Sequence, residues 1–222
     1  GVSQCSDDEW RSQMNRELLR EALFYPGTQV KIKTVKDDSR AQIKDIEAFI
    51  RQKVDLLVVA PNEAEAITPV IEKAYQSGIP VVLVDRKIKS EKYTAYVGAD
   101  NYEMGKQIGT YITSRLQGKG KIVELAGLRG STPAVERHRG FLDVLHKCPD
   151  IKIVSTVDAG WFKDSAREAF DSILHCQPEI DLLFAHNDRM AAGAYEAALR
   201  QSRNQEILFI GVDALSGDNL GV

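Results

Sequence analysis

The sequence predicts an α/β fold of two doubly wound parallel-sheet lobes joined by a hinge. First, short runs of β-branched residues alternate with amphipathic stretches of helical length along the whole chain, as in repeated β-α-β units. Second, several short runs are almost continuously apolar, which is typical of strands buried on both faces between helices. Third, this alternation is interrupted once, between residues 85 and 95, and a second α/β series follows.

Nine strands are expected, each a short run rich in β-branched and other apolar residues. In chain order they are Gly1–Gln4, Gln29–Thr34, Leu56–Ala60, Val81–Asp85, Ala95–Gly98, Lys121–Ala126, Ile151–Val157, Leu182–Ala185 and Leu208–Asp213. The runs at Leu56 and Val81 leave no solvated face, so they are expected to be central strands. Gly1-Val2-Ser3 is interpreted as the end of a strand that begins before residue 1.

Seven helices are expected between these strands. In chain order they are Glu9–Phe24, Arg40–Lys53, Glu63–Ser77, Asn101–Gln117, Ala134–Lys147, Lys163–His175 and Arg189–Gln201. Residues 6–8, Ser-Asp-Asp, can cap the first helix, and Asp100 can cap the helix that begins at Asn101. The Gly-Ile-Pro sequence at 78–80 ends the third helix and restarts an extended chain.

The polar loop Lys87–Lys92 marks the expected passage from one lobe to the other. It joins two strands without an intervening helix, and a new helix begins right after Gly98. We therefore expect an N-terminal lobe over residues 1–99 and a C-terminal lobe over residues 100–222.

Composition excludes some classes of function. Lys and Arg total 29 and Asp and Glu 32, a formal net charge of −3 without a basic stripe, so no nucleic-acid contact is expected. The longest apolar runs are strand-sized and too short to span a bilayer. Any membrane attachment is therefore expected through segments outside residues 1–222.

Cysteine and histidine spacing predicts neither a metal site nor a cofactor. Cys5, Cys148 and Cys176 form no CxxC pair, and although the last two could be neighbours, free thiols are the favoured interpretation. His146 with Cys148 and His175 with Cys176 match no usual zinc spacing.

Polar and aromatic side chains follow the carboxyl ends of several expected strands, the edge where ligands of open α/β sheets bind. Carboxylate, amide and guanidinium groups can bind vicinal hydroxyls in pairs, and tryptophan faces can cover the C–H patches of a sugar ring. The candidate residues are Asp7, Glu9, Trp10, Asp85 and Arg86 in the first lobe, and Arg137, Trp161, Asn187 and Asp213 in the second.

Each candidate also has an ordinary structural interpretation. Asp85 and Arg86 could form a surface ion pair, and both tryptophans could belong to the core. Asn187-Asp188 could cap the helix expected at Arg189, with Asp188 as a capping residue. The hypothesis of a binding site rests on the candidates falling at one edge.

Five motifs occur in the order and spacing of a known family. They are Val84–Arg86, Val97–Asn101, Glu136–Phe141, Ala185–Ala194 and Gly211–Asp213. With them the chain resembles type I periplasmic binding proteins, namely the ribose-binding type, and the sugar-binding core of the LacI repressor family, over essentially its whole length. The resemblance implies binding of a small sugar between two lobes.

The same resemblance assigns roles to the candidate residues. Asp85 and Arg86 would contact sugar hydroxyls from the first lobe, and Arg137, Asn187 and Asp213 from the second. Trp10 and Trp161 would lie against the sugar ring, whereas Asp100 and Asn101 match the lobe crossover and are expected to be structural.

Two departures from the family pattern stand out. The first loop carries Asp7, Glu9 and Trp10 where the family often has an asparagine and a pair of phenylalanines, which indicates a polyol other than ribose. The polar residues taken together fit a monosaccharide such as fructose, ribose or another pentose. Family members also return to the first lobe after the strand expected at 208–213. This chain stops at Val222, so an incomplete C-terminal part is expected.

Other classes of function were compared with these features. The turn Gln4–Asp8 lacks the glycines of a nicotinamide site, and the chain has no Walker, GxSxG or HExxH motif. A receiver domain would need an aspartate where Ala60-Pro61-Asn62 stands. This domain is thus not expected to be an enzyme, although the full-length protein could carry a histidine kinase.

Three kinds of binding protein remain open. A LacI-type repressor needs a helix-turn-helix, and a periplasmic transport protein works with an ABC transporter. The opening residues 1–11 look most like the extracytoplasmic sensor of a Bacteroides-type hybrid two-component histidine kinase. That interpretation implies a periplasmic location, a sugar ligand and, as a further option, a homodimer through the sensor domain.

Overall fold

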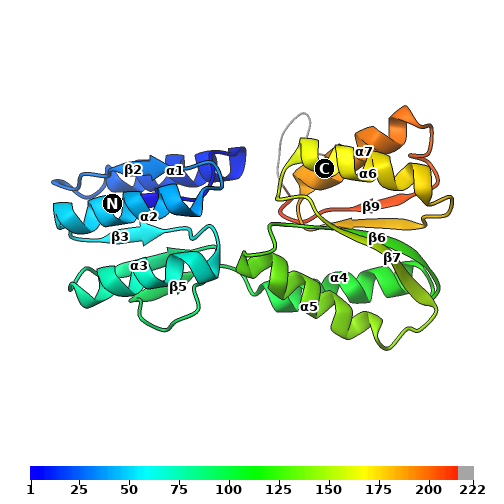
Figure 1. Ribbon diagram of the computed structural model, residues 1–222, viewed down its shortest axis with the longest axis horizontal. Coiled ribbons are helices and arrows are strands. Elements are labelled where there is room, and N and C mark those ends of the chain that lie inside the picture. Colours follow the sequence, from blue (N-terminus) through cyan, green and yellow to red (C-terminus); the bar gives the residue numbers. More distant parts are fainter. Residues whose placement is uncertain (215–222) are drawn as a thin grey trace. The chain divides into compact units, whose positions relative to one another are not determined.

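The computed structural model describes residues 1–214, which form parts of two compact units (Figure 1). Unit 1 comprises Gly1–Ala99 with Gly130–Thr132, and unit 2 comprises Asp100–Arg129 with the chain from Pro133 onward. Residues 215–222, the end of the expected second lobe, lie outside the described residues.

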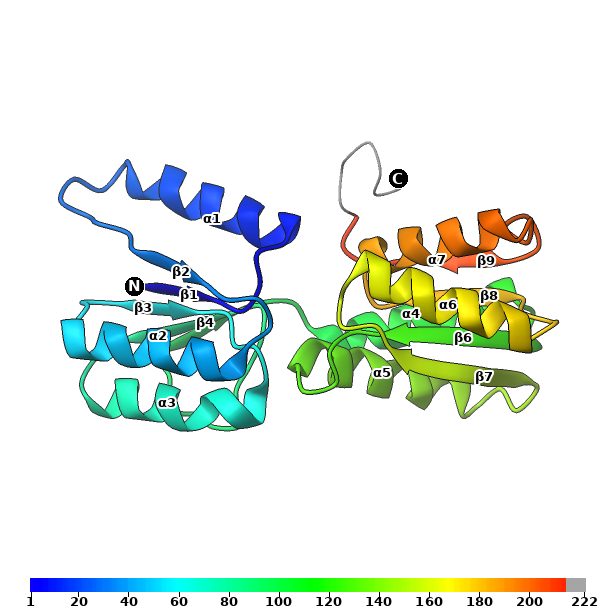
Figure 2. The ribbon, with the colours of Figure 1, turned by 45° about the horizontal axis from the view of Figure 1, so that its top comes forward.

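Unit 1 is built on a parallel sheet with the strand order β2-β1-β3-β4-β5. Its first strand is therefore internal, as in a doubly wound fold. Figure 2 shows α1 on one face of this sheet and α2 and α3 on the other. The elements are β1 (Val2–Gln4), α1 (Glu9–Ala22), β2 (Ile32–Thr34), α2 (Ser39–Gln52), β3 (Leu57–Val59), α3 (Ala64–Gln76), β4 (Val81–Val84) and β5 (Ala95–Val97).

Unit 2 is built on a second parallel sheet with the order β7-β6-β8-β9. Helices α4 and α5 cover one face of this sheet and α6 and α7 cover the other (Figure 1). The elements are α4 (Asn101–Arg115), β6 (Gly120–Ala126), α5 (Thr132–Leu145), β7 (Ile151–Asp158), α6 (Lys163–Cys176), β8 (Leu182–Ala185), α7 (Asp188–Arg200) and β9 (Leu208–Ile210).

The cores follow from this layering. Unit 1 packs α2 and α3 onto the sheet through side chains such as Phe49, Ile71 and Leu83, each at most 1% exposed. Strand β8 is buried along its length, with Leu182 and Phe184 in one core cluster and Leu183 in another. Successive residues of a strand point to opposite faces, so a sheet covered on both sides needs such an uninterrupted apolar run.

The expected α/β fold with two parallel-sheet lobes is confirmed, and the expected strands and helices are found with small changes of boundary. Strand β2 begins at Ile32 rather than Gln29, and β9 ends at Ile210 rather than Asp213. Beyond Ile210, the carbonyl of Val212 accepts a hydrogen bond from the backbone N–H of Asp188 at 2.9 Å instead of continuing the ladder. Leu56 is 44% exposed rather than buried, because it precedes the strand that begins at Leu57.

Two expected helix caps are confirmed. The side chain of Asp8 accepts a hydrogen bond from the N–H of Arg11, and that of Asp100 accepts one from the N–H of Glu103, both at 2.9 Å. Such caps satisfy backbone donors that the first helical turn leaves without partners. They fix where α1 and α4 begin.

Candidate functional site

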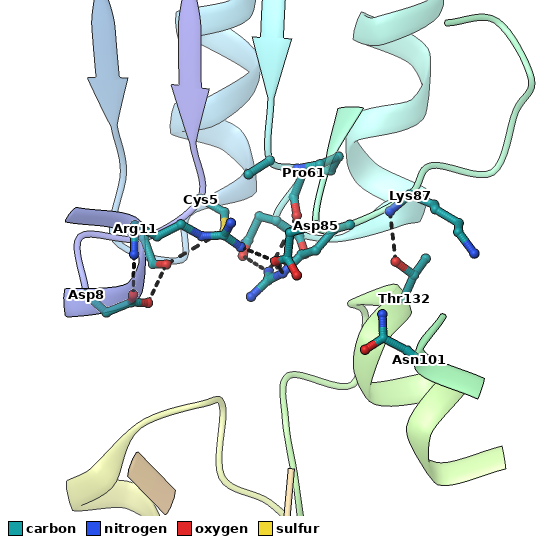
Figure 3. A network of polar contacts seen from close by, with 12 residues as sticks. Cys5, Asp8, Arg11, Pro61, Asp85, Lys87, Asn101 and Thr132 are labelled. Atoms are coloured by element: carbon teal, nitrogen blue, oxygen red, sulfur yellow. Dashed lines mark hydrogen bonds and ion pairs between the residues drawn. The ribbon is translucent and has the colours of Figure 1, made fainter. Parts of the chain in front are cut away.

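The carboxyl ends of the strands of unit 1 lead to a buried cluster of charged side chains (Figure 3). Its centre is Asp85, which directly follows β4. The Nη2 atom of Arg11 lies 2.6 Å from Asp85 Oδ2, and the Arg86 Nε atom lies 3.8 Å from the same oxygen. Both arginines are almost completely buried, at 3% and 5% exposed. Two buried guanidinium groups beside one carboxylate hold the Asp85 side chain in one orientation.

Arg11 and Arg86 are fixed by further contacts. The Nη1 atom of Arg86 donates to the backbone carbonyl of Asn62 at 3.0 Å. Burial disfavours the guanidinium charge of Arg11, but Cys5, Asp85 and Asp8 together outweigh burial and raise its pKa above the ordinary value. Arg11 therefore stays a cation at any pH at which the protein is folded.

The candidates around the start of α1 lie differently from Asp85 and Arg86. Asp7 is exposed and forms an ion pair with Lys36 at 3.1 Å, and Glu9 is exposed at the start of α1. Trp10 is half-buried, and the guanidinium carbon of Arg11 stands 4.7 Å from its ring centroid. A cation over an aromatic face orients the ring. The structure thus joins Trp10, through Arg11, to Asp85.

Two residues of this edge were not among the sequence candidates. Arg11 was missed because a charged residue in the first turn of a helix is usually exposed. Asp37 follows β2, its backbone N–H donates to the carbonyl of Cys5 at 2.9 Å, and burial raises the pKa of its carboxyl. The rule that selected Asp85, a carboxylate just beyond a strand, would have found Asp37 as well.

In unit 2, the side chain of Arg137 is the centre of a second cluster. It is 5% exposed, and its Nε donates to Asn101 Oδ1 at 2.9 Å while its Nη1 donates to the backbone carbonyl of His186. Its Nη2 lies 3.6 Å from Asp213 Oδ1, and its Cζ stands 5.6 Å from the ring centroid of Trp161. Three sequence candidates, from α5 and two loops, are therefore in contact.

Trp161 and Asn187 are held by the same loops. The ring of Trp161 covers Gly127 so closely that a Cβ atom there would stand 2.2 Å from it, which explains the glycine. Asn187 Nδ2 donates to the carbonyl of Trp161 at 3.2 Å, and Asn187 Oδ1 accepts the N–H of Met190 at 2.9 Å. Asn187 is therefore the N-cap of α7. The expectation of Asp188 as a capping residue was wrong, because the helix begins at Asp188 itself.

Three candidates share an uncommon backbone conformation. Asp85, Trp161 and Asp213 have φ angles of 64°, 76° and 99°. Residues with a Cβ atom rarely adopt positive φ, and such positions cluster at binding sites where surrounding contacts hold them. At Asp85, the backbone N–H donates to the carbonyl of Val97 at 2.8 Å and the carbonyl accepts from the Tyr96 hydroxyl at 3.1 Å.

The described residues contain neither a metal cluster nor a disulfide nor a membrane-spanning helix. No group of three or more His, Cys, Asp or Glu side chains within residues 1–214 could hold a metal ion. Cys5, Cys148 and Cys176 are free thiols. No helix in this part of the chain is both long and apolar enough to cross a membrane.

The fold and these two polar clusters define a binding protein of the two-lobed α/β class. The sequence matches the periplasmic binding protein domain family over residues 2–218, and the chain belongs to that family. The expected family is thereby confirmed.

Known proteins of this kind are similar over most of the chain. A fructose-binding periplasmic domain of a hybrid two-component system has a TM-score of 0.97 and 55% identity, covering 100% of this chain and 74% of that one. The binding protein of the arabinose ABC transporter from Shewanella sp. ANA-3 has a TM-score of 0.91 and 30% identity, covering 97% and 74%. The ribose import binding protein RbsB of Bacillus subtilis is 33% identical over 84% of this chain, which spans 60% of that relative's length.

Proposed function

We propose that this chain binds a monosaccharide outside the cytoplasm and serves as the sensor domain of a two-component signalling system. The observation that carries the proposal is the likeness, at 55% identity and over 100% of the chain, to a fructose-binding domain of such a system. The identity to the arabinose-transporter protein is much lower, at 30%. Fructose is therefore the first ligand to test.

The proposed ligand contacts come from both units. From unit 1, the sugar would be contacted by Trp10, Asp85 and Arg86. Arg11 would link Trp10 to Asp85. Arg137, Trp161, Asn187 and Asp213 would contact it from unit 2, and Asp7 and Glu9 would act at the rim of the site. Buried guanidinium and carboxylate groups form charge-assisted hydrogen bonds to hydroxyls, and indole faces cover the C–H side of the ring.

The proposed mechanism is a change of population between two arrangements of the units. A sugar that binds residues of both units favours the arrangement in which it reaches both sets. It shifts the equilibrium only by its difference in affinity for the two arrangements. The signal would pass across the membrane as a change in the arrangement or pairing of sensor domains. Kinase chemistry would belong to another part of the full-length protein, because the periplasmic binding protein family binds ligands without transforming them.

A second candidate is a free binding protein of an ABC transporter. It is supported by likeness to the arabinose and ribose binding proteins, at 30% and 33% identity. The reading frame that contains this chain separates the two: a membrane span and a kinase after it support the sensor, and a lone signal peptide before it supports the transport protein.

A thermal-shift screen tests sugar binding directly. The protein is heated with fructose, ribose, arabinose, other monosaccharides, disaccharides and nucleosides, each at the same concentration. A ligand that binds only the folded state at a hundredfold excess over its Kd adds about 2.7 kcal/mol, which raises the Tm of a protein of this size by about 5–10 °C. A selective rise with one monosaccharide supports the proposal, and no rise with any sugar contradicts it.

A further inference from the structure

One buried glutamate, one buried histidine and one partly exposed histidine form a network next to the cluster of unit 2. Glu124 is on β6 and is completely buried, although it carries a charge. Its Oε1 atom lies 3.0 Å from His186 Nε2, both oxygens lie 2.9 Å from His138 Nδ1, and Thr156 Oγ1 donates to Oε2 at 3.2 Å. A buried carboxylate is stable only when such donors replace its water.

The hydrogen bonds assign one tautomer to His186. Its Nδ1 atom accepts from the backbone N–H of Gly127 at 3.3 Å, so this nitrogen carries no proton. The Nε2 atom then carries the proton and donates it to Glu124. His186 is fully buried, and burial lowers the pKa of its imidazole, in keeping with a neutral ring. The positive partner of Glu124 is His138, whose pKa the hydrogen bond to Glu124 raises.

The same histidine touches two of the residues proposed to contact the sugar. Its backbone carbonyl accepts the hydrogen bond from Arg137 Nη1. Its ring centroid lies 6.3 Å from that of Trp161, and Gly127, which donates to the imidazole, is covered by the Trp161 ring. His186 thus contacts a guanidinium through its backbone carbonyl and an indole through its ring, and the two come from different elements.

We propose that His186 is a positioning residue, which Glu124 and Gly127 hold in one orientation so that its carbonyl and ring fix Arg137 and Trp161 for the sugar. The proposal rests on the function proposed above, since the placement of Arg137 and Trp161 affects affinity only if they contact the ligand. The groups that face His186 are Glu124 on β6 and Arg137 and His138 on α5.

Two substitutions separate polar positioning from simple packing. The His186→Phe variant keeps a ring in the core, but this ring can neither donate a hydrogen bond to Glu124 nor accept one from Gly127. Gln in His186→Gln loses the ring, but its amide can do both. We expect D-fructose affinity, measured by calorimetry, to fall about tenfold or more in His186→Phe, because Arg137 and Trp161 are then no longer held in the geometry that binds the sugar, and to be largely retained in His186→Gln. His175→Phe, an exposed site on α6, is the control and should bind as the unsubstituted protein does.

A ligand-independent measurement completes the test. In a protein labelled with ¹⁵N-histidine, long-range ¹H–¹⁵N spectra should show His186 as the Nε2–H tautomer at neutral pH and show its ring taking up a proton only below pH 6.5, while His138 takes up its proton above pH 6.5. An Nδ1–H tautomer, or a His186 that titrates near the ordinary value of 6.5, would overturn the proposal without any variant or sugar.

The outcomes distinguish the two proposals. If the unsubstituted protein binds fructose and His186→Phe binds it equally well, or better than His186→Gln, the positioning role is wrong and sugar binding stands. If neither the unsubstituted protein nor the His175→Phe control binds any sugar of the panel, the proposed function fails. If a variant does not fold by circular dichroism, the tautomer measurement on the unsubstituted protein still decides.

Discussion

The guanidinium of Arg11 lies 2.6 Å from the carboxylate of Asp85, a residue 74 positions further along the chain. Arg11 belongs to the first turn of α1 and Asp85 follows β4, so the contact joins a helix and a strand end on one edge of the sheet. With the Arg11 side chain 4% exposed and that of Asp85 25% exposed, the pair is largely withdrawn from water. Each charge depends on the other to remain buried.

Replacing Arg11 with alanine is expected to lower the free energy of unfolding by about 3 kcal/mol. The substitution leaves Asp85 beside Arg86 alone and removes a buried charge partner, a change that usually costs about 3–5 kcal/mol when both groups are fully buried. Urea unfolding followed by circular dichroism measures the loss. The control is Arg20→Ala on the same helix, where the arginine side chain is 69% exposed and pairs with Glu17, so that little change is expected. If the two variants have the same free energy of unfolding, the Arg11–Asp85 pair does not stabilise the fold.

Replacing Arg137 with alanine is expected to weaken sugar binding by about 2 kcal/mol, roughly 30-fold, because charge-assisted hydrogen bonds in a site without water are strong. The affinity is measured by calorimetry with the sugar that the thermal-shift screen selects. Arg139→Ala is the matched control, since Arg139 lies two residues further on α5 and stacks over Tyr102 at 4.6 Å. The site assignment fails if Arg137→Ala, Asp85→Ala and Asn187→Ala all bind the sugar with unchanged affinity.

The alternation of apolar runs and amphipathic stretches predicted the elements well, because local pattern decides where strands and helices form when a sheet is covered on both faces. Boundaries that depend on distant partners were less accurate. The last strand ends at Ile210, since the carbonyl of Val212 bonds to the N–H of Asp188 at the start of α7. No pattern near residue 212 contains that information.

The residues of the candidate site also fall into two groups: those that local sequence pattern could select and those whose burial depends on distant partners. Strand-end position selected Asp85, Arg137 and Asp213, and the structure brings each of them into a buried polar cluster. The burial of Arg11 depends on a carboxylate 74 residues away, so its position in the first helical turn indicated solvent instead. Whether the selected residues contact a sugar stays a prediction, which the variants above test.

Backbone strain at Asp85 gives a prediction that separates the main chain from the carboxylate. The φ angle of Asp85 is 64°, which glycine adopts freely and alanine does not. Asp85→Gly and Asp85→Ala both remove the carboxylate and both should lose sugar affinity, but the glycine variant should be about 1 kcal/mol more stable. Urea unfolding compares the two.

Lys53 supplies the control for this comparison. It has a φ of 51° at the end of α2, and it is exposed. The pair Lys53→Gly and Lys53→Ala should therefore show a similar difference in stability with no loss of affinity. If Asp85→Gly is no more stable than Asp85→Ala while the Lys53 pair differs, neighbouring contacts rather than φ determine the stability at Asp85.

The pH dependence of stability should show the charge of Glu124. Burial alone would raise the pKa of this carboxyl, but hydrogen bonds from His138 and His186 outweigh burial and lower it from the ordinary value of 4.5 to about 2. Because the pKa is lower in the folded state, the ionised carboxylate stabilises the fold above pH 4.5. This stabilisation is lost as the pH falls from 4.5 towards 2, and it amounts to at most about 3 kcal/mol.

The two histidines act in opposite directions at higher pH. The pKa of His138 is raised, so its contribution is complete below pH 6.5 and is lost as the pH rises through the folded value. The pKa of His186 is lowered, so acidification below 6.5 protonates the unfolded chain first and reduces stability. The contribution of His138 changes above pH 6.5 and that of His186 changes below it. The loss of stability that belongs to Glu124 falls between pH 4.5 and pH 2.

In Glu124→Gln the free energy of unfolding is therefore expected to fall less as the pH drops below 4.5. Urea unfolding at a series of pH values from 7 to 3 measures this fall. The amide keeps the size of the side chain but carries no charge that acid can remove. Glu179→Gln is the control, because Glu179 pairs with Lys121 on the surface, where solvent screens the interaction. In this control, the free energy of unfolding should fall below pH 4.5 as it does in the unsubstituted protein. The free energy of unfolding could instead fall equally steeply between pH 4.5 and pH 3 in Glu124→Gln and in the control. Glu124 would then not be the carboxylate whose ionisation stabilises unit 2.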